Sequence, residues 1–156
     1  MKIAAFALAL LASCQADLPP AEQALAKLSA GDPRGALSAV QNHLKSRAEL
    51  QQSTIDELIM VEALALSVTE QHHASLAVLH REYEDRRLVR AYSRLSTELF
   101  EHGAYSQARL VLEAALATWP EHEEQIQPML VSVERAEAGD PLLGDLNLQP
   151  IYCDFD

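Results

Sequence analysis

The sequence has few glycine, aromatic and cysteine residues. Among its 156 residues there are 5 glycines, 2 cysteines and 1 tryptophan, and aromatic residues make up 5%. Alanine, leucine and glutamate are abundant instead, which favours helices and gives little support to strands. The chain contains no glycine-rich phosphate loop, no Gly-x-Ser-x-Gly motif and no pair of closely spaced cysteines, so it lacks the common catalytic and metal-binding motifs.

Positive charge is also scarce. Lysine and arginine number 12 against 23 acidic residues, which gives a formal charge of −11. Because an acidic surface repels phosphate backbones, nucleic acid is not expected as a partner. No segment is apolar for long enough to span a membrane as a permanent helix. The length of the chain predicts one domain.

The stretch from Leu99 to Pro120 has the clearest local pattern. Gly103 interrupts one apolar helical pattern, Tyr105 opens a second, and Trp119 with Pro120 ends it. The spacing therefore predicts two helices joined by a tight turn.

This pattern resembles a tetratricopeptide repeat, a helical hairpin that recurs about every 34 residues. The match covers residues 89–122 and has two mild departures, since Tyr92 replaces a tryptophan and Ser96 replaces a glycine. The positions that carry the resemblance are Tyr92, Leu95, Ser96, Leu99, Gly103, Tyr105, Ala108, Leu112, Ala115 and Pro120.

Two other units match the pattern less well. A step of 34 residues towards the N-terminus places a degenerate repeat at 55–88, and a third match lies at 31–44. The degenerate repeat depends on Leu58, Val61, Ala74 and Val78. The resemblance implies an all-α fold, a TPR-like array of about three helical hairpins with a C-terminal capping helix and a non-helical tail. An ordinary antiparallel helical bundle is the alternative.

Helix start and stop signals predict where the helices lie. Asp32 and Thr54 have the sequence context of N-caps, and Pro128 is expected to interrupt the last helical segment. The predicted helices cover 21–30, 33–47, 54–69, 71–85, 88–102, 104–118 and 128–138, with a short turn at 121–126. Met129, Leu130 and Val133 are expected to pack inwards.

Residues 1–16 have the features of an export signal, with Lys2 as the positive start and an apolar core at 3–12. The sequence Leu11-Ala12-Ser13-Cys14 resembles the lipobox of bacterial lipoproteins, which implies cleavage before Cys14 and lipidation of that cysteine. The chain is then divided into a lipoprotein signal peptide (1–13), a spacer (14–20), a TPR-like helical domain (21–139) and an apolar and acidic C-terminal tail (140–156).

The lipobox implies an outer-membrane lipoprotein that faces the periplasm, because Gln15 rather than aspartate follows the cysteine. Cleavage after Ala16 is one alternative and would leave a soluble periplasmic protein. The other alternative is a cytoplasmic protein in which residues 1–16 form a buried helix.

The resemblance also implies a binding surface. Tetratricopeptide arrays present the first helix of each hairpin along a concave groove, where a partner protein or peptide binds. On this alignment the partner-binding positions are Ile59, Ala63, Leu66, Arg90, Ser93, Arg94, Thr97, Phe100 and Glu101. Packing between hairpins is the alternative for Ile59, Leu66 and Phe100.

No residue is assigned to catalysis, and no metal or cofactor is expected. A zinc site from His73, His80 and Glu84 is conceivable, but the two histidines are two helical turns apart, about 10 Å along the axis. Cys153 is left as a free thiol if Cys14 is lipidated, and it can be buried or can link two chains.

The sequence therefore predicts a non-enzymatic interaction scaffold or adaptor of the bacterial cell envelope. Its partner is an unidentified envelope protein or peptide, and the lipid at Cys14 attaches it to the membrane. The alternatives are a small exported metal-binding protein or enzyme that uses the histidine and acidic cluster, and a structural homo-oligomer formed through the apolar tail.

Overall fold

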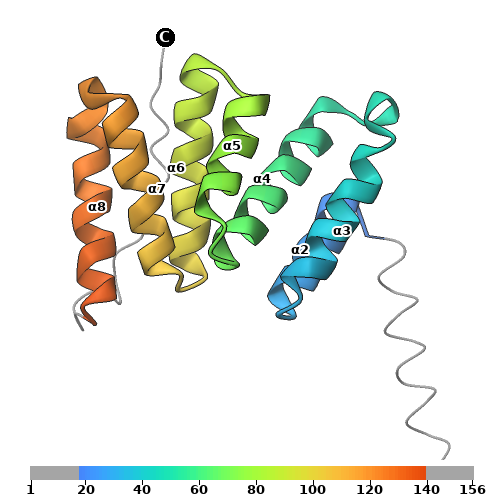
Figure 1. Ribbon diagram of the computed structural model, residues 1–156, viewed down its shortest axis with the longest axis horizontal. Coiled ribbons are helices and arrows are strands. Elements are labelled where there is room, and N and C mark those ends of the chain that lie inside the picture. The colour runs from blue at the N-terminus through green and yellow to red at the C-terminus, as the bar shows by residue number, and fades with distance from the viewer. Residues whose placement is uncertain (1–17, 140–156) are drawn as a thin grey trace, which may run out of the picture. The chain divides into compact units, whose positions relative to one another are not determined.

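The computed structural model describes residues 18–139 (Figure 1). Seven α-helices, two 3-10 helices and no strand occur in this range, so the expected all-α fold is confirmed. The chain divides into two compact units between Ala65 and Leu66. The predicted signal peptide, Cys14, Cys153 and the predicted tail at 140–156 lie outside the described residues.

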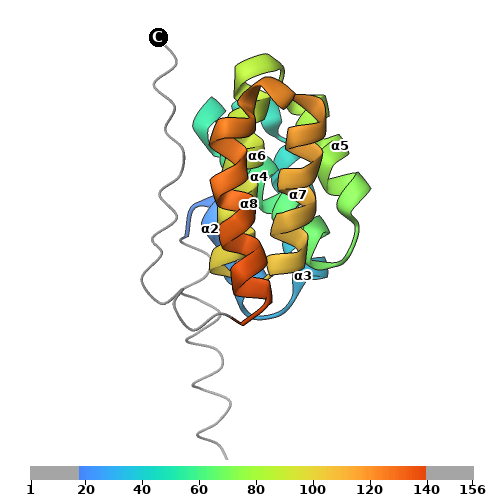
Figure 2. The same ribbon diagram turned by 90° about the vertical axis from the view of Figure 1, so that its left-hand side faces the viewer.

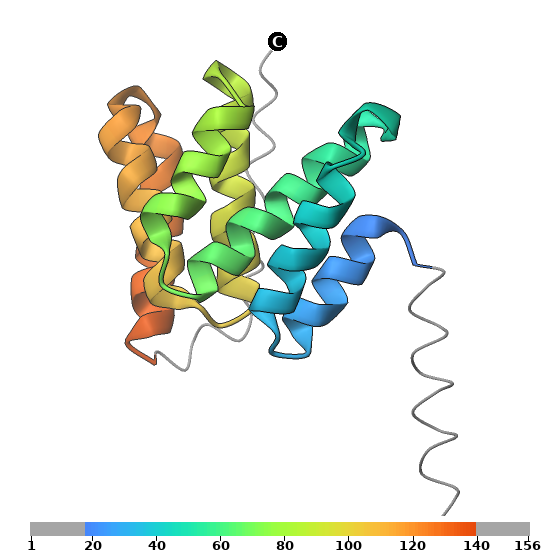
Figure 3. The same cartoon turned by 45° about the vertical axis from the view of Figure 1, so that its right-hand side comes forward.

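The first unit contains α2 (Pro20–Ser29), α3 (Pro33–Leu44), the 3-10 helix η1 (Arg47–Glu49) and most of α4 (Gln52–Val68). Figure 3 shows α2, α3 and α4 side by side. Asp32 caps α3 as predicted, since its Oδ1 accepts a hydrogen bond of 2.8 Å from the backbone N–H of Gly35. The core residues of this unit come from all three helices and are Ala21, Ala24, Val40, Leu58 and Val61.

The second unit contains four helices. They are α5 (His72–Glu82), α6 (Asp85–Glu101), α7 (Tyr105–Thr118) and α8 (Glu123–Glu137), and the 3-10 helix η2 (Pro120–His122) joins the last two. Helix α6 packs along α7, and α7 packs along α8 (Figure 2). None of the helices between residues 18 and 139 combines the length and the hydropathy needed to cross a membrane.

The α6–α7 hairpin is built as its sequence pattern predicts. Most apolar positions that define the pattern are buried, whereas Tyr105 is half-buried and Pro120 is exposed. The buried ones are Tyr92, Leu95, Leu99, Ala108, Leu112 and Ala115. Small residues on α7 let the two helices approach, and the large residues fill the space between them. Helix α7 ends at Thr118, directly before the predicted stop at Trp119 and Pro120.

The turn between α6 and α7 depends on Gly103, whose φ is 72°. Its N–H donates to the carbonyl of Phe100 at 2.9 Å, and the N–H of Ala104 donates to Leu99 at 2.8 Å. These two bonds are the Schellman pattern that closes a helix C-terminus, and the left-handed conformation they need favours glycine.

The same turn occurs after α4, but with a glutamate in the glycine's place. Glu70 has a φ of 63°, and its N–H donates to Ser67 while the N–H of Gln71 donates to Leu66. Glu70 lies 33 residues before Gly103, so the expected step of 34 residues is wrong here by one. Accordingly, Ala74 is exposed, and the buried small residue of α5 is Ser75, whose hydroxyl accepts a bond of 2.8 Å from that of Ser67.

Pro128 does not interrupt the last helix, contrary to prediction. Helix α8 begins at Glu123 and continues through Pro128 to Glu137. The missing N–H of Pro128 frees the carbonyl of Glu124, and both residues are exposed, so water can satisfy that carbonyl. The buried face consists of Ile126, Met129, Leu130 and Val133, so the three inward-facing residues that were predicted are confirmed.

Four other helix ends differ from prediction by more than one residue, namely the end of α3, the start of α4, the end of α5 and the start of α6. Helix α3 stops at Leu44, and the residues to 47 enter a separate 3-10 turn. Helix α4 starts at Gln52, two residues before the predicted cap at Thr54. Only Tyr83 and Glu84 separate α5 from α6, because Tyr83 adopts an extended conformation and buries its side chain to 7% exposure.

Candidate functional site

Helix α6 has one buried face and one face that carries polar and charged side chains. The residues packed inwards include Tyr92, Leu95 and Leu99. At 100° per residue, six predicted partner-binding positions share the other side of the helix. We call them the α6 outer face: Arg90, Ser93, Arg94, Thr97, Phe100 and Glu101.

The members of the α6 outer face differ in exposure. Arg90, Arg94 and Glu101 are exposed, whereas Ser93 and Phe100 are half-buried and Thr97 is 8% exposed. Charged side chains therefore form the accessible part of the face, with two arginines in its N-terminal part and one glutamate at its C-terminal end.

Three hydroxyl groups are gathered around Ser93, two on the α6 outer face and one, that of Ser96, on the buried side of the helix. The hydroxyls of Ser96 and Thr97 both donate to the carbonyl of Ser93, at 2.8 and 3.0 Å. The hydroxyl of Ser93 itself is buried and finds no hydrogen-bond partner among the described residues. A buried hydroxyl without a partner costs free energy. A partner could reach this oxygen only if the side chains that cover it moved.

Charge is distributed unevenly along the second unit. Residues 81–94 contain five of the chain's 12 cations, Arg81, Arg86, Arg87, Arg90 and Arg94, against three acids. Residues 95–139 contain two cations against eight acids. The N-terminal part of α6 is therefore a basic segment in an acidic protein.

Two contacts connect the α6 outer face to its surroundings. The Nε of Arg94 lies 3.9 Å from a carboxylate oxygen of Glu98, a distance too long for a hydrogen bond, and the arginine side chain is 53% exposed. The rings of Phe100 and Tyr105 lie 5.2 Å apart across the α6–α7 turn. Arg94 is thus loosely paired, while Phe100 at the other end of the face is packed.

The three predicted positions on α4 differ from those on α6. Ile59 and Ala63 are 1% and 0% exposed, so neither offers surface to a partner, and their proposed binding role is not compatible with this structure. They lie in the first unit, where apolar side chains on α4 build core. Leu66 is half-buried, and its carbonyl accepts bonds from Gln71 and Thr69 at the helix end.

The sequence did not reveal that aromatic rings gather around the buried Tyr92 on the opposite side of α6. Tyr92 is 2% exposed, its hydroxyl lies 2.9 Å from Nε2 of His80, and its ring meets those of His80 and Trp119 edge-on. Burial raises the pKa of Tyr92. The pairing of residues 12 and 27 positions apart follows from helix packing, so no local sequence signal could have identified it.

The alternative zinc site is not assembled. No three histidine, cysteine, aspartate or glutamate side chains between residues 18 and 139 come close enough to hold a metal ion. His80 contacts Tyr92 instead, and His73 is exposed. The candidate zinc residues are therefore not brought together by the fold.

A polar contact joins α7 to α8. The Nε of Arg109 lies 3.1 Å from one oxygen of Glu137, and the hydroxyl of Ser106 donates to the other oxygen at 2.7 Å. The hydrogen bond from Ser106, followed by that from Arg109, lowers the pKa of Glu137. Arg109 also bonds to Glu113 at 2.8 Å, and the two carboxylates raise its pKa. This contact fixes α8 on the hairpin.

No protein-family model, curated protein or solved structure matches this chain.

Proposed function

We propose that this chain is an exported scaffold of the bacterial envelope, lipid-anchored at Cys14, that binds a partner protein or peptide through the α6 outer face. In this proposal the helical hairpins form a short TPR-like array. The observation that carries it is the division of α6 into two faces, because one face is buried in the α6–α7 hairpin while the other keeps Arg90 and Arg94 exposed.

The charge of the face indicates the chemistry of the partner. Arg90 and Arg94 lie one helical turn apart, and an arginine guanidinium binds carboxylates with paired hydrogen bonds. The ring of Phe100 follows towards the C-terminal end of the helix, whereas the buried hydroxyl of Ser93 lies between the two arginines in sequence. We therefore infer a partner segment with acidic side chains opposite the arginines and an apolar side chain opposite Phe100.

Binding can be tested by affinity capture from envelope extract, with the anchored mature protein as bait. The double charge reversal Arg90→Glu and Arg94→Glu should reduce recovery of a discrete partner by about tenfold or more, because two attractive contacts become repulsive. Arg135→Glu is the matched control, since this exposed arginine lies on α8, away from the face. Equal recovery by the double variant and the wild type would refute the binding surface.

The anchor is tested separately by Cys14→Ser. The wild type should fractionate with membranes and incorporate labelled fatty acid, whereas the variant should do neither, because the thioether forms only on the cysteine sulfur. The lipoprotein assignment would be contradicted if the two proteins fractionated identically and neither incorporated the labelled fatty acid. The α6 proposal would then still be tested by the capture experiment. Neither proposal involves a catalytic residue or a cofactor.

A further inference from the structure

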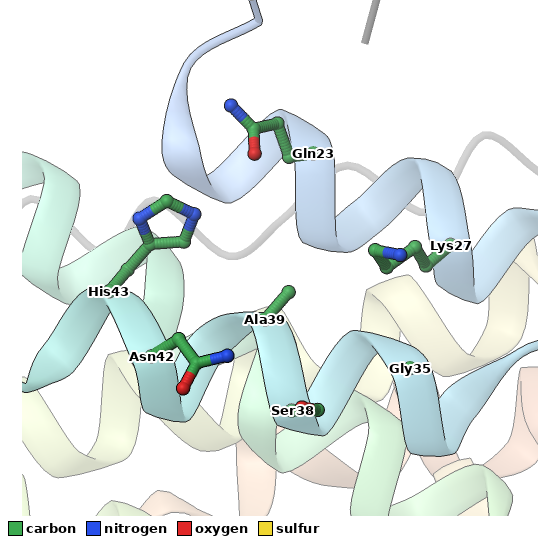
Figure 4. Close-up of a pocket in the computed structure, with 7 residues that line it drawn as sticks. All are labelled: Gln23, Lys27, Gly35, Ser38, Ala39, Asn42 and His43. Carbon is green, nitrogen blue, oxygen red and sulfur yellow. The ribbon is translucent and has the colours of Figure 1, made fainter. Parts of the chain in front are cut away.

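The first unit contains a polar pocket between α2 and α3, remote in sequence from the α6 outer face. Its volume is 310 Å³, the size that suits a small molecule rather than a protein segment. Figure 4 shows the seven residues that line it, which are Gln23, Lys27, Gly35, Ser38, Ala39, Asn42 and His43. We refer to this site as the α2–α3 pocket.

The lining of the α2–α3 pocket contains no acid, although the protein has nearly twice as many acids as bases. Lys27 forms no ion pair with any residue in the described part of the chain, and the His43 ring has no hydrogen-bond partner there. Both side chains are half-buried, so water screens them less than it screens a fully exposed charge. The nearest acid in sequence to the Gly35 end, Asp32, is occupied in capping α3.

The uncharged residues add hydrogen-bonding groups of known direction. Lys45 donates to Oδ1 of Asn42 at 2.8 Å, which leaves the amide NH₂ of Asn42 to serve as a donor. Gln23 donates its own NH₂ to the carbonyl of Leu18 at 2.7 Å, which leaves its side-chain oxygen as an acceptor. Ser38 supplies a hydroxyl that bonds to no other described residue.

The two ends of the pocket differ. Figure 4 shows Lys27 towards the Gly35 end, with Gln23 towards His43 at the other end. Gly35 is the third residue of α3, and its N–H already donates to the Asp32 carboxylate, so this cap offsets the helix dipole at the Lys27 end. The cationic group of Lys27 therefore favours a negative charge at one end, and the mixed donors and acceptor suit a neutral polar group at the other.

We propose that the α2–α3 pocket binds a small organic oxyanion, with its carboxylate or phosphate beside Lys27 and a hydroxyl or amide group between Gln23 and Asn42. Ala39 forms the small-residue side of the pocket, whereas the Asp32 carboxylate fills the space beside the Cα of Gly35. Gly35 cannot be replaced without displacing the Asp32 cap, since an added Cβ would collide with that carboxylate. This proposal is independent of the α6 outer face.

Nuclear magnetic resonance titration of the full chain tests the site, with glycerol 3-phosphate, inorganic phosphate and acetate as separate probes. At least one probe should shift the amide signals of residues 35–43 and saturate, and Lys27→Gln should weaken that binding by about tenfold. Asn42→Ala should weaken glycerol 3-phosphate more than inorganic phosphate, because only the former carries hydroxyl groups to the far end.

Arg34→Gln is the matched control, because this exposed cation lies on α3 but does not line the pocket. It should leave the binding constant within about twofold of the wild type. An equal loss in Lys27→Gln and Arg34→Gln would overturn the proposal in favour of unspecific charge attraction. Absence of saturable shifts with all three probes up to about 20 mM would also overturn it.

Discussion

Glu70 and Gly103 show how one residue sets the stability of a turn. Both close a helix with the same pair of hydrogen bonds in the left-handed conformation, but only Gly103 adopts it without strain. We expect Glu70→Gly to stabilise the protein by about 0.5–1 kcal/mol, after the greater entropy of glycine in the unfolded chain is subtracted. Thermal unfolding measures the change.

Gly103→Ala is the reciprocal test and should destabilise the protein by about 1 kcal/mol. An added Cβ at Gly103 meets no atom within 4 Å, so the cost comes from the backbone conformation alone. If Gly103→Ala leaves the free energy of unfolding unchanged, the strain that we attribute to the left-handed conformation of Glu70 is absent as well.

A substitution at Ser93 should affect the stability of the fold and the binding of the proposed partner differently. Its hydroxyl is buried without a partner, so Ser93→Ala should leave the free energy of unfolding unchanged or raise it by up to about 1 kcal/mol. If the hydroxyl serves the proposed partner, the same variant should bind more weakly in the capture assay. Chemical denaturation and capture on one preparation supply both values, and a clear loss of stability would show that the hydroxyl is already satisfied.

At the scale of the element, α8 tolerates a proline because of where its exposed side lies. Pro128→Ala restores the missing N–H, which can then bond to the carbonyl of Glu124. We expect the free energy of unfolding to rise by about 1–2 kcal/mol. This is less than the full cost of a proline inside a helix, because alanine also makes the unfolded chain more flexible. The exposed neighbour Gln127→Ala is the control, and it should change the melting temperature far less.

The contact between α7 and α8 makes stability depend on pH. Because the pKa of Glu137 is lowered in the folded chain, its contribution is complete above the ordinary glutamate pKa of about 4.3 and is lost as the pH falls through the lowered value. Glu137→Gln should therefore lower the melting temperature at pH 7, and the difference from wild type should shrink at a pH well below the ordinary glutamate pKa.

The exposed acid Glu134 on the same helix has no such partner among the described residues. Glu134→Gln should consequently follow the wild type at both pH values. If the difference in melting temperature between Glu137→Gln and the wild type stayed constant with pH, the glutamine would be disrupting packing rather than an ionised contact.

At the scale of the whole molecule, the excess of acid would oppose the proposed acidic partner, while the basic segment of α6 would attract it. The net charge of −11 acts over long range, whereas Arg90 and Arg94 act at contact distance. If local contacts dominate, raising salt from about 0.05 to 0.3 M should weaken capture, because screening removes the attraction. Stronger capture at high salt would indicate that long-range repulsion governs the encounter and that the arginines contribute little.

The two proposed binding sites lie in different units of the chain. The α2–α3 pocket belongs to the first unit and the α6 outer face to the second. The variants Lys27→Gln and Arg90→Glu are far apart in the chain and share no described contact, so their effects on stability should be additive.

The sequence by itself determined the helices and the α6–α7 hairpin. The periodic apolar residues and the helix stop signals at Gly103 and Pro120 act through local geometry. Local geometry depends only on neighbouring residues, so the sequence alone predicts it. It also placed Arg90 and Arg94 on the exposed side of their helix, because a period of 3.6 separates the two faces.

Only the tertiary structure decided which residues meet. Ile59 and Ala63 are buried and therefore cannot belong to the predicted binding surface. In α5, Ser75 rather than Ala74 is the small residue that packs inwards. The exposed side of α8 accommodated Pro128, and the approach of α2 to α3 created a pocket that no motif announces. Each of these outcomes depends on side chains from distant parts of the chain, whose contacts are not encoded in local spacing.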